Sequence, residues 1–175
     1  MQRNAEESNT VFASRQVWQS ERPRIMVVAC SDGRYQQSLD EFLHSLNIHH
    51  YDRLYAPGGP GALAPSSFSY FRGEHFRQES EFLIRAHLLQ EIMLIFHGAA
   101  LPEGPKEATC ADYLRKMPYA TQAEIHRQQE ADLKEVVKSI TRWDPTVRVR
   151  AFRAEVERDH RVLFVPLDTQ PPPAW

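Results

Sequence analysis

Short apolar runs alternate with amphipathic stretches along most of the chain, and this pattern predicts strands followed by helices. Residues 24–29 form an apolar, β-branched run that is typical of a buried strand. Residues 37–46 carry four apolar side chains at helical spacing, which predicts a helix with one apolar face. A second strand is predicted at residues 48–56 and a second helix at residues 74–89.

The same alternation continues through the second half of the chain. The most apolar stretch, residues 91–96, predicts a third strand, and residues 122–143 predict a long helix on which His126, among polar neighbours, is expected to be solvated. Residues 147–156 and 161–166 are the last predicted strands, expected to form a hairpin at one edge. We therefore predict an α/β fold with three layers: a mostly parallel central sheet flanked by helices, with an antiparallel edge strand.

Composition divides the chain into three segments. Residues 1–23 are polar and are interpreted as an N-terminal arm with weak helical character, in which Phe12 and Trp18 are candidates to dock on the body or on a second subunit. Residues 24–168 are predicted to form a single domain, because no linker or repeat interrupts them. Residues 169–175 contain three consecutive prolines and are interpreted as an extended tail.

Charge and hydropathy exclude several classes of protein. The net charge of −2 gives no indication of a nucleic-acid surface. No run approaches the roughly 18 apolar residues of a membrane span, and the polar N-terminus lacks the apolar core of a secretory signal. We therefore expect a cytoplasmic protein. In a reducing compartment its two cysteines, Cys30 and Cys110, are expected at a metal or catalytic site rather than in a disulfide.

The sequence Cys-Ser-Asp-Gly-Arg at residues 30–34 lies between the first predicted strand and the first helix. Ligands bind at this end of the strands in open α/β sheets. Residues two apart in an extended segment point to the same side, so Cys30 and Asp32 can hold a soft divalent metal such as zinc. Arg34 can clamp Asp32 with two hydrogen bonds. The alternative is a half-buried cysteine followed by a charged helix start.

A glycine-rich turn, Pro-Gly-Gly-Pro-Gly at residues 57–61, follows the second predicted strand. Such a turn indicates unusual dihedral angles or a close approach of the backbone to another group. One hypothesis is a phosphate cradle, although the lysine of a P-loop and the spacing of a dinucleotide fingerprint are both missing. The other is a tight turn that lines a pocket.

Two further candidate ligands follow the third predicted strand. His97 ends this strand, where a histidine is either a polar cap of the core or part of a site at the sheet edge. Cys110 lies in a stretch that resembles a capping box, with Thr109 as N-cap and Asp112 reaching back. A cysteine at the first helical position is favoured as a thiolate by the helix dipole. The alternative is a small residue packed beneath the preceding loop.

Two thiolates, a carboxylate and an imidazole form a reasonable tetrahedral zinc set: Cys30, Asp32, His97 and Cys110. The motif at residues 30–34, followed by a His and then a Cys after a later strand, resembles the β-class carbonic anhydrases. The resemblance extends from about residue 24 to residue 167. It implies zinc ligation by Cys30, His97 and Cys110, with Asp32 either paired with Arg34 or occupying the fourth zinc position.

The chain departs from the family pattern between its second and third candidate ligands. The family keeps the His and the second Cys three positions apart, whereas here Ala100 occupies that place and Cys110 follows an insertion at residues 99–109. Either the insertion bulges outward and returns Cys110 to the metal, or the third ligand is lost.

The resemblance also implies a function. The implied function is that of a zinc-dependent lyase, which reversibly hydrates carbon dioxide to bicarbonate by zinc-bound hydroxide. In this resemblance Asp32 would orient the hydroxide, and Arg34 would hold Asp32 away from the metal. A homodimer is implied as well, with the N-terminal arm crossing to the neighbour. Two alternatives stay open: a catalytically silent zinc-binding protein of the same fold, and a phosphate- or nucleotide-processing α/β enzyme that uses the glycine-rich turn.

Overall fold

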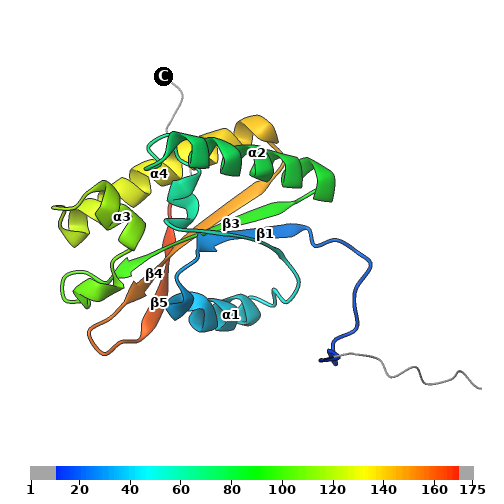
Figure 1. Cartoon of the computed structure of the whole chain (residues 1–175), viewed down its shortest axis with the longest axis horizontal. Coiled ribbons are helices and arrows are strands. Elements are labelled where there is room, and N and C mark those ends of the chain that lie inside the picture. Colours follow the sequence, from blue (N-terminus) through cyan, green and yellow to red (C-terminus); the bar gives the residue numbers. More distant parts are fainter. Residues whose placement is uncertain (1–10, 170–175) are drawn as a thin grey trace, which may run out of the picture.

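A computed structural model describes residues 11–169, and its centre is a five-stranded sheet with the order β2-β1-β3-β4-β5 (Figure 1). The strands are β1 (Ile25–Cys30), β2 (Asp52–Ala56), β3 (Glu91–Ala99), β4 (Arg148–Val156) and β5 (Val162–Leu167). Strands β1 to β4 pair in parallel, and β5 pairs antiparallel with β4. The predicted mostly parallel sheet with an antiparallel edge strand is therefore confirmed.

Helices cover both faces of the sheet. Helix α1 (Gln36–Ser45) lies on one face, and α2 (Tyr70–His87) and α4 (Gln122–Trp143) lie on the other (Figure 1). The short helix α3 (Ala111–Lys116) precedes α4. Within residues 11–169, three 3-10 helices complete the elements: η1 (Gly33–Tyr35), η2 (Gly59–Ala62) and η3 (Lys106–Ala108). The three-layer arrangement agrees with the prediction.

Alternation along the central strands explains the two apolar layers. Val28 and Phe96 belong to the core cluster that contains residues of α2 and α4, whereas Val27 and Ile95 belong to the cluster on the α1 side. All nine residues of β3 are buried, as expected for a parallel strand covered on both faces. The last of these residues carry His97 to the carboxyl edge of the sheet.

Element boundaries differ from the predictions where local hydrogen bonds decide them. Helix α2 begins at Tyr70 rather than at residue 74, because the Ser69 hydroxyl accepts a hydrogen bond from the Arg72 backbone N–H and caps the helix. Strand β2 is shorter than the predicted 48–56. Strand β3 runs through Ala99 and therefore includes His97 within the sheet.

The described part of the N-terminal arm, residues 11–23, contains no helix or strand, so weak helical character is wrong for this part. Its aromatic side chains do not dock on the body of the chain: Phe12 is 82% exposed and Trp18 is 84% exposed. Residues 1–10 and 170–175 lie outside the described residues. Within residues 11–169 no helix is both long and apolar enough to cross a membrane.

Candidate metal centre

The carboxyl ends of β1 and β3 lie side by side, because Ala29 is aligned with Ile95 in the parallel ladder. Cys30, the last residue of β1, and His97 of β3 therefore meet at the same edge of the sheet. The glycine-rich turn packs against this edge. Gly59 has a φ of +56°, and a Cβ built on it would lie 2.9 Å from the Cys30 backbone nitrogen. Only glycine permits this close approach.

The turn is covered by the protein itself. Residues 58–62 are buried, and Gly61 lies directly against the Tyr113 hydroxyl. Its backbone therefore offers no exposed cradle for a phosphate group. The interpretation as a tight turn that closes over the end of β1 agrees with this packing.

Three of the four candidate zinc ligands come together. The Sγ atoms of Cys30 and Cys110 and an imidazole nitrogen of His97 all lie within 4.8 Å of one another. Cys110 and His97 are buried, and Cys30 is partly buried. The insertion between His97 and Cys110 thus returns Cys110 to the other two residues. Two sulfurs and an imidazole nitrogen are a donor set that zinc prefers.

His97 presents a free lone pair to this cluster. Its Nδ1 lies 3.3 Å from the Ala108 carbonyl oxygen, and a carbonyl can only accept, so Nδ1 carries the proton. Its Nε2 is buried and has no hydrogen-bond partner among the described residues. An unpartnered buried nitrogen is costly, and a metal ion would satisfy it. The residues present therefore fit a zinc ion.

The two thiols are coupled by a hydrogen bond. This bond lowers the pKa of Cys30, against the opposing effect of burial. The same Cys30 interaction, together with burial, raises the pKa of Cys110. The hydrogen bond therefore favours one thiolate within the pair, and a bound cation would displace the remaining proton.

Asp32 is not part of the three-residue cluster, because Arg34 holds its carboxylate. The Arg34 Nε atom donates to Asp32 Oδ1 at 2.9 Å, and its Nη2 donates to Oδ2 at 2.5 Å. The backbone N–H of Arg34 also donates to Oδ1. These hydrogen bonds hold the pKa of Asp32 at about 2. Of the two arrangements that the resemblance allows, this is the one in which Asp32 pairs with Arg34.

No family model and no curated protein matches the chain, but solved structures do. The β-carbonic anhydrase CafA of the fungal pathogen Aspergillus fumigatus is 15% identical with a TM-score of 0.48, over 87% of this chain and 78% of that chain. β-Carbonic anhydrase isoform I of the protozoan Trichomonas vaginalis is 10% identical with a TM-score of 0.48, over 86% and 87%. Carbonic anhydrase from Streptococcus mutans is 13% identical with a TM-score of 0.44, over 83% and 82%.

The inserted segment supplies two backbone acceptors to the site. The Glu107 carbonyl accepts from Arg34 Nη1 at 3.0 Å, and the Ala108 carbonyl accepts from the Tyr35 hydroxyl at 2.7 Å as well as from His97. The sequence gives no indication of these backbone contacts, which depend on the path of the insertion. In the sequence, only the position of Tyr35 directly after Arg34 indicates that this residue could belong to the site.

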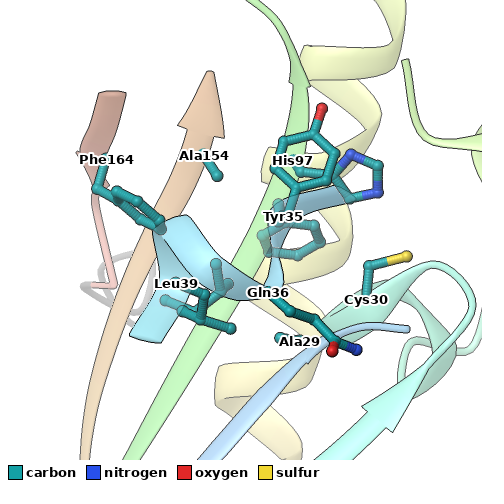
Figure 2. Close-up of a pocket in the computed structure, with 10 residues that line it drawn as sticks. Ala29, Cys30, Tyr35, Gln36, Leu39, His97, Ala154 and Phe164 are labelled. Atoms are coloured by element: carbon teal, nitrogen blue, oxygen red, sulfur yellow. The ribbon is translucent and has the colours of Figure 1, made fainter. Parts of the chain in front are cut away.

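A small apolar cavity of about 10 Å³ lies beside Cys30 and His97 (Figure 2). In Figure 2 the Cys30 sulfur and the His97 ring lie on the side of this cavity away from Phe164 and Leu39. The volume is about that of one water molecule.

The predicted capping box is wrong. Cys110 itself is the N-cap of α3, and its side chain makes no capping hydrogen bond. The Thr109 hydroxyl instead donates to Gln122 Oε1 at 2.5 Å. The carboxylate of Asp112 turns to α2, where Arg72 binds both of its oxygens at 3.1 and 2.8 Å. Tertiary partners have replaced the local ones.

The prediction that His126 is solvated is also wrong, because this side chain is only 4% exposed. Gln122, His126 and Gln129 share the inward face of α4, and the absence of a side chain at Gly98 leaves room for the first two. Gln129 donates to the His97 carbonyl oxygen at 2.9 Å. Helix α4 therefore packs against the carboxyl end of β3 and binds the backbone of His97 through Gln129.

Proposed function

We propose that this chain is a zinc-dependent lyase of the β-carbonic anhydrase type, which reversibly hydrates carbon dioxide to bicarbonate. One observation carries the proposal: a buried, unpartnered His97 Nε2 meets two thiols from separate segments, beside a carboxylate held by arginine. The resemblance of residues 30–34 to the family motif supports it. Cys30, His97 and Cys110 are the proposed zinc ligands.

When bound, zinc acidifies a water molecule and so supplies a nucleophile at neutral pH. Three protein ligands are the usual number in catalytic zinc sites, in contrast to the four of structural sites. Asp32 does not complete the ligand set, because Arg34 holds both carboxylate oxygens. Its ionised carboxylate would accept a hydrogen bond from a water molecule held at the metal and would fix the orientation of that water.

We further propose a homodimer. The arm leaves Phe12 and Trp18 exposed, and apolar side chains of this size gain free energy when a second chain covers them. A groove of about 330 Å³ beside Arg34 and Tyr35 is a second candidate surface for the partner. Covering it would exclude water from the site. Sedimentation velocity of the wild type and of Trp18→Ser tests this proposal, with a shift toward monomer expected for the variant.

We also propose that the protein works in the cytoplasm. Cys30 and Cys110 are both free, and their proposed role requires reduced sulfur. A reducing compartment keeps such a pair available for metal. Fractionation of cells that express the full chain tests this location.

The size of the apolar cavity favours a second candidate function. A cavity of about 10 Å³ beside Cys30 and His97 has no room for carbon dioxide within one chain. If no partner chain completes a substrate pocket, the same residues form a catalytically silent zinc-binding protein of this fold.

Elemental analysis of the wild type beside Cys110→Ser tests the metal site first. About one zinc ion per chain is expected in the wild type and a large loss in the variant. Stopped-flow hydration of carbon dioxide is then measured for the wild type and for Asp32→Ala, which should retain zinc. Absence of zinc from protein purified without chelators would overturn the proposed function. Zinc without hydration would favour the silent protein.

A further inference from the structure

We propose that Tyr35 is a positioning residue, which fixes the Ala108 carbonyl and through it the orientation of the His97 ring. The inference rests on the proposed function in one respect, namely that His97 Nε2 faces a metal. It assigns a role to the inserted segment that departs from the family pattern. That segment becomes part of the site instead of an outward bulge.

The first observation is a shared acceptor. The Ala108 carbonyl oxygen accepts from the Tyr35 hydroxyl at 2.7 Å and from His97 Nδ1 at 3.3 Å. A carbonyl oxygen has two lone pairs, so it serves both donors at once. All three residues are buried, with Tyr35 at 7%, Ala108 at 5% and His97 at 3% exposure. Water therefore cannot readily replace either hydrogen bond.

The second observation is a ring contact between the same two side chains. The Tyr35 and His97 rings lie 4.2 Å apart between centroids, at an interplanar angle of 46°. Figure 2 shows Tyr35 beside His97 at the end of β3. This contact restricts rotation of the imidazole, which would otherwise exchange its nitrogens with its ring carbons. The hydroxyl and the ring of Tyr35 thus both hold the His97 ring in the same orientation.

The third observation links this arrangement to the Cys30–Arg34 motif. Tyr35 follows Arg34 in η1, and Arg34 donates to the adjacent Glu107 carbonyl at 3.0 Å. Two consecutive carbonyls of the inserted segment are thus held by the last residue of the motif and by the residue that follows it. Groups that orient a metal-binding histidine from behind typically change metal affinity 10- to 100-fold when removed. Tyr35 holds the carbonyl that orients His97.

The test compares Tyr35→Phe with Tyr51→Phe. Both variants lose one hydroxyl and keep the ring. Tyr51, however, directly precedes the amino end of β2, at the opposite edge of the sheet, and its hydroxyl donates to Asp40 of α1. The first readout is the exchange rate of the His97 Nδ1 proton with solvent, measured by NMR on metal-free protein. The second is the affinity for Co²⁺, with the absorption spectrum of the complex as a report on ligand geometry.

For Tyr35→Phe we expect exchange of the Nδ1 proton about tenfold faster and Co²⁺ binding about tenfold weaker, with an altered spectrum. For Tyr51→Phe both quantities should stay within about twofold of the wild type, since its lost hydrogen bond does not involve His97. If either quantity is unchanged in Tyr35→Phe, the inference is overturned. If the wild type binds no Co²⁺, the proposed function fails, and the exchange rate alone decides: faster exchange supports the positioning role and an unchanged rate overturns it.

Discussion

Two arginine–aspartate pairs lie close to the candidate centre, and they differ in what surrounds them. Asp32 and Arg34 are two residues apart, and the Arg34 side chain is 57% exposed. Arg72 and Asp112 join the first turn of α2 to α3, with side chains 21% and 10% exposed. Gly58 packs directly beneath the Asp112 carboxylate.

Two ion pairs of the same chemical type therefore serve different purposes. Formation of the Asp32–Arg34 pair orders little chain, and its main effect is on one carboxylate. The Arg72–Asp112 pair is shielded from water and connects two helices, so loss of Arg72 leaves the partly buried Asp112 with only the more distant Arg115, at 3.8 Å. We expect the first pair to matter for activity and the second for stability. Four experiments, ordered by their effect on the free energy of unfolding, test this distinction.

The largest loss of stability is expected for Arg72→Met, at about 2–4 kcal/mol, because Asp112 would lose both of its close charge-assisted hydrogen bonds. Urea unfolding measures it. Arg85→Met on the same helix is the control: Arg85 is 67% exposed and pairs with Glu81, so a change below about 0.5 kcal/mol is expected. Equal losses in the two variants would contradict a special role for the Arg72–Asp112 pair.

A smaller loss, about 1–3 kcal/mol, is expected for Gly58→Ala. Gly58 has a φ of +86°, and an added Cβ would lie 2.7 Å from Asp112 Oδ2. Gly33→Ala is the matched change beside the other pair, where an added Cβ meets nothing within 4 Å. Its unfolding free energy should stay within about 0.5 kcal/mol of the wild type. A similar loss of unfolding free energy in Gly58→Ala and Gly33→Ala would mean that the surroundings of the two ion pairs do not differ.

Asp32→Asn should lower stability by about 1 kcal/mol or less, since Arg34 is largely in solvent. Under the proposed function the same change should lower carbon dioxide hydration at least about 100-fold, because the amide no longer presents an ionised acceptor. Asp112→Asn should show the reverse, with reduced stability and near-normal activity per folded molecule. Stopped-flow hydration and urea unfolding of both variants measure the two effects.

The smallest effect is on the pH dependence of stability. Arg34 holds the pKa of Asp32 at about 2 in the folded state, below its ordinary value of 3.8. The pair therefore stabilises the fold fully above pH 4, and this contribution is lost as the pH falls toward 2. The stability difference between the wild type and Asp32→Asn should be constant from pH 5 to 7 and should change between pH 4 and 2. A difference independent of pH would exclude this role of Arg34.

The two pairs also show how far sequence reasoning extends. The Asp32–Arg34 pair was predictable, because both residues lie in one short turn whose position follows from the strand before it. Helix α4 was predictable for a similar reason: its apolar spacing is regular, and Thr121 and Glu124 form a capping box at its start. In these cases the deciding contacts are local.

The Arg72–Asp112 pair was not predictable, because residues near Asp112 in the sequence suggested a local capping role that a distant arginine overrides. The polar neighbours of His126 predict a solvated side chain, whereas the space above Gly98 accommodates it in the interior. The return of Cys110 to the cluster likewise depends on the path of the insertion, which no local pattern specifies. Long-range packing decides all three.

The parallel pairing of β1 with β3 bears on the order of events during folding. These neighbours are separated in the chain by α1, β2 and α2, so Cys30 meets His97 only after a long crossover has closed. Contacts of such high sequence separation form slowly. If the ligands assemble after the transition state, a metal held by this cluster should slow unfolding strongly and leave the refolding rate nearly unchanged, whereas ligands that assemble within the transition state should make the metal speed refolding.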